Sequence, residues 1–322
     1  MSQLPNAATR EGADAGGGYG GRTKDNAMAD RPVTADRTIP ASWYRPSIAE
    51  RVRENMDRLT AAERKAAHIL LANYPVVGLE TVAEFAGRAN VSAPTILRFV
   101  ARLGFAGYPE FQKELRAELD ARLLPPLSKS APAASEFDAD DFLDRFRSAV
   151  VDNITETFSH VPPAEFEGVV GLLANLKRRV HVLGGRFSDS LARYATAHLQ
   201  IIRPDVVHLF GQKENWRDQL LDLGKKDVLV LFDVRRYQED LANLAMNAAQ
   251  RGTVIVLVTD QWLSPVARHA QHVLAARISV PSNWDSGAAV LALVEAVVAA
   301  TTERLGDSAR HRIAAVEQLR GQ

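Results

Sequence analysis

The hydrophobic residues between positions 79 and 111 recur with the spacing of two short helices, predicted at 81–89 and 93–103. One face of each helix is apolar, which predicts that both helices pack against a common core. The apolar positions are Val82, Phe85, Ala86 and Ala89 in the first helix and Ile96, Leu97, Val100 and Leu103 in the second.

Polar residues around these helices predict where each one begins. Thr81 and Glu84 have the spacing of a capping box, in which two side chains satisfy free backbone amides. Asn90 tolerates the left-handed backbone of a tight turn, and Ser92 is a favourable N-cap for the second helix. Pro94 is compatible with a first helical turn. The segment is therefore predicted to be a helix-turn-helix unit.

Further helices are predicted around this unit, at 51–59, 60–74 and 109–122. A bundle of this size can bury one apolar core. The residues expected in that core are Leu59, Ile69, Leu70, Val82, Phe85, Ile96, Val100 and Phe105.

In the second half of the chain, runs of Val, Leu and Ile alternate with helical segments. Such runs are typical of parallel strands that are covered on both faces. The predicted fold is an all-α helix-turn-helix domain followed by an α/β domain with a doubly wound five-stranded parallel sheet. The strands are expected at 180–183, 206–210, 227–232, 253–258 and 272–276, and the helices at 140–160, 163–176, 189–202, 216–223, 238–250, 265–270, 286–304 and 310–319.

Composition divides the chain further. A glycine-rich stretch poor in aliphatic residues predicts disorder, and a run with three prolines predicts a linker. The expected segments are a disordered tail at 1–44, the helix-turn-helix domain at 45–124, the linker at 125–137, the α/β domain at 138–306 and a helical tail at 307–322.

Charge and cysteine content narrow the function. The 322 residues carry no net charge, so any affinity for nucleic acid must be local. Cysteine is absent, which excludes disulfides and cysteine metal sites. The eight histidines show no metal-ligand spacing, and we expect neither a metal nor a cofactor. We find no secretory signal or membrane span in the sequence, so a soluble cytoplasmic protein without membrane contact is expected.

The candidate DNA-binding residues lie on the second helix of the helix-turn-helix unit. Residues 85–109 contain three arginines and no acidic residue. Small hydroxyls near a helix start, followed by guanidinium groups, suit the base edges and phosphates of a DNA major groove. These residues are Ser92, Thr95, Arg98 and Arg102. The alternative is an ordinary helical hairpin with a solvated basic face.

A ligand crevice is expected outside the carboxyl ends of the parallel strands. After the first strand, Gly184 and Gly185 allow close backbone approach, and Ser188 lies at a helix start that can offer amide donors to an anion. A plain strand-to-helix turn would also use these glycines. After the fourth strand, Thr259 and Ser264 are candidates to contact a ligand. The loop 282–286 either caps the final helix or covers the crevice.

The third strand is followed by Arg235 and Arg236, a candidate clamp for a carboxylate or phosphate. Asp233 is a candidate to orient one of them. In the alternative interpretation, one arginine pairs with Asp233 or Glu239 and the other is solvated.

The two halves together resemble the RpiR-type family of bacterial transcription regulators, which join a helix-turn-helix domain to a SIS (sugar isomerase) domain. The resemblance covers residues 48–304. It implies that Ser92, Thr95, Arg98 and Arg102 contact an operator, that Ser188 and Ser264 line an effector site, and that the protein is a homodimer or homotetramer responding to a sugar phosphate. Its motifs are Leu59-Thr60-x-x-Glu63, Val91-Ser92-x-x-Thr95-Ile96-x-Arg98-Phe99, Leu103-Gly104-Phe105-x-Gly107-Tyr108, Gly184-Gly185-x-x-Ser188 and Ser264-Pro265.

One loop departs from that family. The phosphate loop after the third strand is typically Ser-x-Ser-Gly-x-Thr, but residues 233–238 here are Asp-Val-Arg-Arg-Tyr-Gln. A carboxylate or another anionic metabolite is therefore an equally good candidate effector. The expected function is a DNA-binding regulator, not an enzyme, whose effector modulates operator binding.

Two other functions remain open. A SIS-type phosphosugar isomerase would need a positioned base, for which the candidates are His181, His198, Glu214 and Glu239. In a third possibility, the α/β domain serves only for dimerisation.

Overall fold

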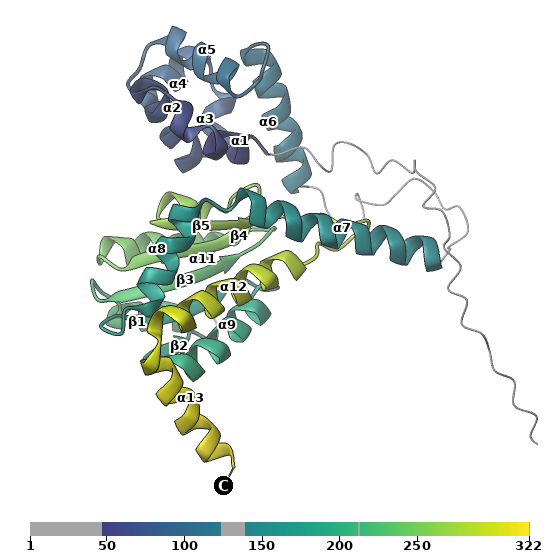
Figure 1. The fold of residues 1–322 in the computed structure, drawn as a ribbon. Coiled ribbons are helices and arrows are strands. Elements are labelled where there is room, and N and C mark those ends of the chain that lie inside the picture. The colour runs from purple at the N-terminus through teal and green to yellow at the C-terminus, as the bar shows by residue number, and fades with distance from the viewer. Residues whose placement is uncertain (1–46, 124–138, 212, 322) are drawn as a thin grey trace, which may run out of the picture. The chain divides into compact units, whose positions relative to one another are not determined.

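The computed structural model describes residues 47–123, 139–211 and 213–321 (Figure 1). The tail predicted at 1–44 and the linker predicted at 125–137 lie outside the described residues. The two predicted domain types are both present, so the predicted fold class is confirmed. The two domains are described separately below.

Residues 47–123, the described part of the helical domain, form one 3-10 helix and six α-helices, three of which begin with a capping box. The boxes pair Ser47 with Glu50, Thr60 with Glu63, and Thr81 with Glu84. The turn residue Asn90 is left-handed, with φ of 50°, as its side chain permits. The elements are α1 (Ile48–Glu54), η2 (Met56–Arg58), α2 (Ala61–Ala72), α3 (Val76–Leu79), α4 (Val82–Ala89), α5 (Ala93–Arg102) and α6 (Tyr108–Leu123).

The core of this domain differs from the prediction at one position of α5. Leu97 was expected to be buried, but it is 48% exposed. Phe99 is buried in its place, and its ring packs edge-on against Phe85 with 6.4 Å between the centroids. Ile69 and Val82 are only partly buried at the edge of the core. The other expected core residues are buried, namely Leu59, Leu70, Phe85, Ile96, Val100 and Phe105.

The α/β domain contains five strands, all parallel, in the order β2-β1-β3-β4-β5. From β1 the chain adds β2 on one side and then β3, β4 and β5 on the other, so the order of the strands reverses between β1 and β3. The strands are β1 (Arg179–Gly184), β2 (Val206–His208), β3 (Asp227–Asp233), β4 (Val254–Asp260) and β5 (His272–Ala276). The helices are α7 (Ala139–His160), α8 (Pro163–Ala174), α9 (Asp189–Ile202), α10 (Lys213–Gln219), η4 (Leu220–Asp222), α11 (Glu239–Gln250), η5 (Pro265–Arg268), α12 (Ala288–Leu305) and α13 (Asp307–Arg320).

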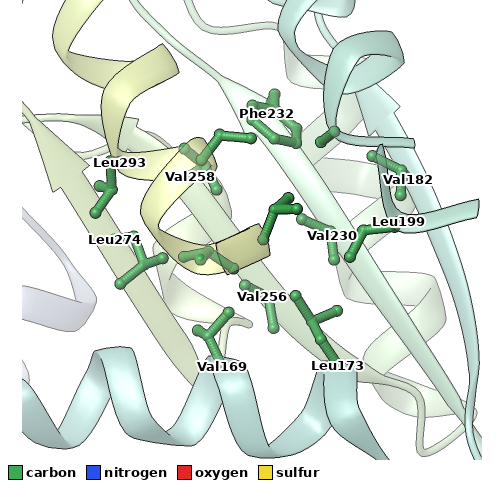
Figure 2. Close-up of a pocket in the computed structure, with 14 residues that line it drawn as sticks. Val169, Leu173, Val182, Leu199, Val230, Phe232, Val256, Val258, Leu274 and Leu293 are labelled. Atoms are coloured by element: carbon green, nitrogen blue, oxygen red, sulfur yellow. The ribbon is translucent and has the colours of Figure 1, made fainter. Parts of the chain in front are cut away.

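Helices cover both faces of this sheet, which explains why its strands are apolar throughout. Alternate residues of β3 point to opposite faces: Val228 and Val230 pack with α8, α9 and α12, whereas Leu229 and Leu231 pack with α11. A void of about 30 Å³ remains on the first face. Figure 2 shows that its lining side chains are all aliphatic or aromatic, so this void is part of the core and has no group to bind a polar ligand.

None of the helices in the described part of the chain combines the length and the apolar character that a bilayer crossing requires.

Candidate functional site

The first turn of α5 carries a chain of side-chain hydrogen bonds. Ser92 Oγ lies 2.9 Å from Thr95 Oγ1, and Arg98 Nη2 donates to the same Thr95 oxygen at 3.1 Å. Ser92 and Arg98 are exposed, whereas Thr95 is 5% exposed. Thr95 therefore positions the arginine near the serine, and two exposed polar side chains, Ser92 and Arg98, lie near the start of the helix.

The other two arginines of the acid-free stretch are held by carboxylates of the same chain. Arg102 donates to Glu63 on α2 at 3.0 Å, and Arg88 pairs with Glu80 at 2.7 Å. Among the described residues, Arg98 alone of the three forms no ion pair. Of the four predicted DNA-binding residues, the structure thus brings Ser92, Thr95 and Arg98 together and places Arg102 in a bridge between helices.

A polar cavity of about 160 Å³ lies at the carboxyl ends of β1 and β3 and the start of α12. This is the crevice position expected for a doubly wound sheet. Of the predicted effector residues, Ser188, Arg235 and Arg236 line it. The complete lining is Phe187, Ser188, Leu191, Val234, Arg235, Arg236, Trp284, Asp285, Ser286 and Gly287.

The loop after β3 places two successive arginines in the left-handed region, with φ of 33° at Arg235 and 58° at Arg236. Non-glycine residues rarely adopt this conformation. The buried carboxylate of Asp260 stabilises it by accepting from the Arg235 amide at 2.7 Å, the Tyr237 hydroxyl at 2.5 Å and the Trp262 amide at 3.0 Å. The loop is therefore built around a carboxylate of the chain itself.

The two arginines have different surroundings. Arg235 is 7% exposed, pairs with Asp285 at 3.2 Å and lies 5.1 Å from the centre of the Trp262 ring. Arg236 is exposed and lies 5.5 Å from the centre of the Trp284 ring. The predicted partners were Asp233 and Glu239, and the structure also pairs Arg235 with Asp285, from the loop that precedes α12.

The glycines after β1 have a structural explanation. A Cβ on Gly184 would lie 2.4 Å from the Cα of Asp189, so only glycine allows α9 to start this close to the strand. A Cβ on Gly185 would meet the side chain of Gln238 at 2.8 Å. Ser188, which follows them, donates its hydroxyl to the Phe232 carbonyl at 2.7 Å.

Thr259 and Ser264 do not line the cavity. Both are buried, with 0% and 1% exposure. The Thr259 hydroxyl donates to the Asp233 carbonyl at 2.7 Å, and the Ser264 hydroxyl donates to the Asp233 carboxylate. Ser264 also caps η5 by accepting from the Val266 amide at 3.1 Å. The structure gives both hydroxyls a role in joining β3, β4 and η5.

The described residues contain no group of three His, Asp or Glu side chains that could hold a metal ion.

Comparison with known proteins identifies both domains. Residues 47–122 match the helix-turn-helix domain of the rpiR family, and residues 172–300 match the SIS domain. The chain is therefore a transcription regulator that combines a DNA-binding domain with a SIS domain. It belongs to the RpiR-type regulators, as the sequence motifs predicted.

Individual relatives agree with this assignment. The chain is 23% identical to the HTH-type transcriptional regulator HexR of Escherichia coli (strain K12) over 84% of its own length and 93% of that protein. The chain is also 27% identical to the bifunctional protein glk of Burkholderia thailandensis. That match covers 70% of this chain but only 34% of the glk protein. The sugar isomerase domain of an RpiR transcription factor from Sphaerobacter thermophilus has the same fold, with a TM-score of 0.52, 23% identity, and coverage of 55% of this chain and 99% of that domain.

Proposed function

We propose that this regulator binds an operator through Ser92 and Arg98 and that a small anionic metabolite, a sugar phosphate or a carboxylate, binds the polar cavity and changes operator affinity. The observation that carries the proposal is that each domain presents an exposed arginine without an ion pair to any described residue. These are Arg98 on α5 of the helical domain and Arg236 in the cavity of the α/β domain. Each group suits a negatively charged partner. The effect of the effector equals its differential affinity for the two states, about 1–3 kcal/mol in typical regulators.

The cavity supports binding rather than catalysis. An isomerase needs a base within reach of the sugar carbons. Among the cavity-lining residues, Asp285 is the sole candidate base, and it is paired with Arg235. We therefore propose that the protein is not an enzyme. We also propose that the protein is a cytoplasmic homo-oligomer and that its two domains span residues 45–124 and 138–306. Light scattering of the purified chain would measure the number of subunits.

The DNA-binding part is tested by mobility shifts on an operator that is first selected from genomic fragments with the purified full-length chain. Arg98→Ala is expected to weaken binding by roughly 1–3 kcal/mol if the arginine contacts a guanine. All measurements need one salt concentration, because phosphate contacts make affinity salt-dependent. Arg320→Ala, on α13 of the other domain, is the matched control. Unchanged affinity of the Arg98 variant would remove that residue from the interface.

A further inference from the structure

The cavity presents one uncompensated positive charge. Asp285 is its sole acidic lining residue, and its carboxylate pairs with Arg235. Arg236 forms no ion pair with any described residue. The side chains that line the cavity therefore sum to a single positive charge, the charge that a monoanion would balance. Arg186, whose guanidinium lies 5.2 Å from the Phe187 ring centre, is not among the lining residues.

Two aromatic rings hold this remaining arginine. The Arg236 guanidinium lies 5.9 Å from the Phe187 ring centre and 5.5 Å from that of Trp284, and the rings are 6.1 Å apart at an interplanar angle of 62°. Aromatic faces attract a cation without neutralising it. The guanidinium thus keeps its planar fork for a carboxylate, the anion whose two oxygens it matches.

Three donors at the edge of the cavity are engaged within the chain. The Arg235 amide donates to Asp260, the Arg186 amide to the Gln238 side chain at 2.8 Å, and the Ser188 hydroxyl to the Phe232 carbonyl. A phosphate monoester carries about −1.5 to −2 charge at neutral pH and three strong acceptor oxygens. With these three donors engaged, the Arg236 guanidinium and the Ser286 hydroxyl are the side-chain donors of the lining that remain for those acceptors.

Beside Ser188 and Ser286, the uncharged part of the lining is apolar. Leu191 and Val234 line the cavity, and Phe187 and Trp284 are 56% and 59% exposed. Exposed aromatic rings next to a charged group suit a ligand that has an apolar body and a polar end.

We infer that the ligand class is an aromatic monocarboxylate. Its carboxylate is held by the Arg236 guanidinium, and its ring packs against Phe187 and Trp284. This inference rests on the function proposed above and narrows the anionic effector to one chemical class. It assigns charge recognition to Arg236 alone and makes Arg235, with Asp285 and Trp262, a buried support for the loop.

Isothermal titration calorimetry of the full-length chain tests the ligand class. The probes are benzoate, phenylacetate and indole-3-acetate, compared at equal ionic strength with glucose 6-phosphate and inorganic phosphate. Phenylacetamide keeps the ring and removes the charge. At least one carboxylate is expected to bind more tightly than both phosphates, and the amide is expected to lose roughly ten- to hundredfold in affinity, as loss of a charge-assisted hydrogen bond implies.

Two variants locate the site. Arg236→Gln is expected to reduce carboxylate affinity by a similar factor, and Trp284→Ala to reduce it several-fold, whereas Arg310→Gln on the exposed surface of α13 leaves it unchanged. Circular dichroism would establish that each variant is folded. Tighter Arg236-dependent binding of glucose 6-phosphate would overturn the inference but leave the proposed regulator intact. Binding of none of the five anions would overturn the inference and remove the cavity from the proposed function, while operator binding by Arg98 would still stand.

Discussion

The guanidinium of Arg102 on α5 donates a hydrogen bond of 3.0 Å to the carboxylate of Glu63 on α2. Glu63 is 1% exposed and also closes the capping box of Thr60. Burial acts to raise the pKa of Glu63, but the hydrogen bonds from Thr60 and Arg102 outweigh it and the pKa is lowered. The carboxylate thus fixes the start of α2 and the end of α5 at once.

The variants Arg102→Ala and Arg98→Ala should separate stability from DNA binding. Removing Arg102 takes a partner from a buried carboxylate, so we expect the free energy of unfolding to fall by about 1 kcal/mol or more. For a domain of this size, that corresponds to a decrease in Tm of roughly 4–8 °C. Removing the exposed Arg98 should leave Tm within a degree or two. Differential scanning calorimetry would measure the Tm of both variants. An equal decrease in Tm for the two variants would show that the bridge between Arg102 and Glu63 is not a structural support.

Glu118 should make the stability of the helical domain depend on pH. Its buried carboxyl accepts from the Ile48 amide at 2.8 Å and from the Tyr74 hydroxyl. Burial raises the pKa of Glu118 to about 7, although both hydrogen bonds act to lower it. The folded state therefore holds a proton that the unfolded state releases near pH 4.5. The contribution of Glu118 to the free energy of unfolding is therefore full below pH 4.5 and is lost as the pH rises through 7.

The variant Glu118→Gln removes this titration. Because each pKa unit corresponds to about 1.4 kcal/mol, the wild type should lose on the order of 3 kcal/mol from this group between acidic and alkaline pH. Thermal unfolding at about pH 5 and pH 8 would measure the difference. We expect the glutamine variant to be the more stable protein at pH 8. A wild type and a variant with parallel pH profiles would contradict the assignment.

The two glycines after β1 should respond differently to alanine. In Gly184→Ala, the new methyl meets the backbone of Asp189, which cannot move without displacing α9. A loss of at least about 2 kcal/mol is expected, in the range of overpacked cores. In Gly185→Ala, the methyl meets the end of the flexible Gln238 side chain, and the loss should be smaller. Urea denaturation of both variants would rank them, and the reverse order would refute this explanation.

The carboxylate of Asp260 should be needed for the loop that carries both arginines. In the wild type, the two carboxylate oxygens of Asp260 accept hydrogen bonds from three donors. The variant Asp260→Asn keeps only one of these acceptor oxygens. We expect a loss of about 2 kcal/mol or more in stability, together with loss of anion binding, because a buried donor is left unsatisfied. Tyr237→Phe removes one of the donors and should have a milder effect on both. Calorimetry with the probes named above would measure binding, and unaltered binding by the Asp260 variant would show that the loop holds without it.

Much of the fold could be predicted from the sequence because its signals are local. Helix α9 and strand β5 begin and end at the residues that the pattern gave, and the capping boxes at Thr60 and Thr81 are both formed. The misassignment of Leu97 has a physical reason. Helical periodicity gives the direction of an apolar stripe but not its width, and Phe99, a larger side chain, occupies the core beside Phe85.

The cavity was predictable in place but not in detail. The carboxyl ends of the strands pointed to Ser188, Arg235 and Arg236, all of which line it. The partners of these residues come from loops far away in the sequence, and pairing between loops leaves no local pattern. The position of Asp260 at the carboxyl end of β4, the strand next to β3 in the sheet, was the one available signal. In the loop 282–286, Ser286 accepts from the Ala288 amide and Trp284 lines the cavity, while the N-cap of α12 is Gly287, just after the loop.

The internal carboxylate of Asp260 has a consequence for the rate at which a ligand would bind the cavity. A segment that is already folded around its own anion loses little conformational entropy when a ligand arrives. Association is then limited by diffusion and by the solvation of two exposed rings, rather than by folding of the backbone. In the proposed regulator, we therefore expect ligand binding to reorient side chains rather than the backbone, and the fluorescence of Trp284 would follow that change.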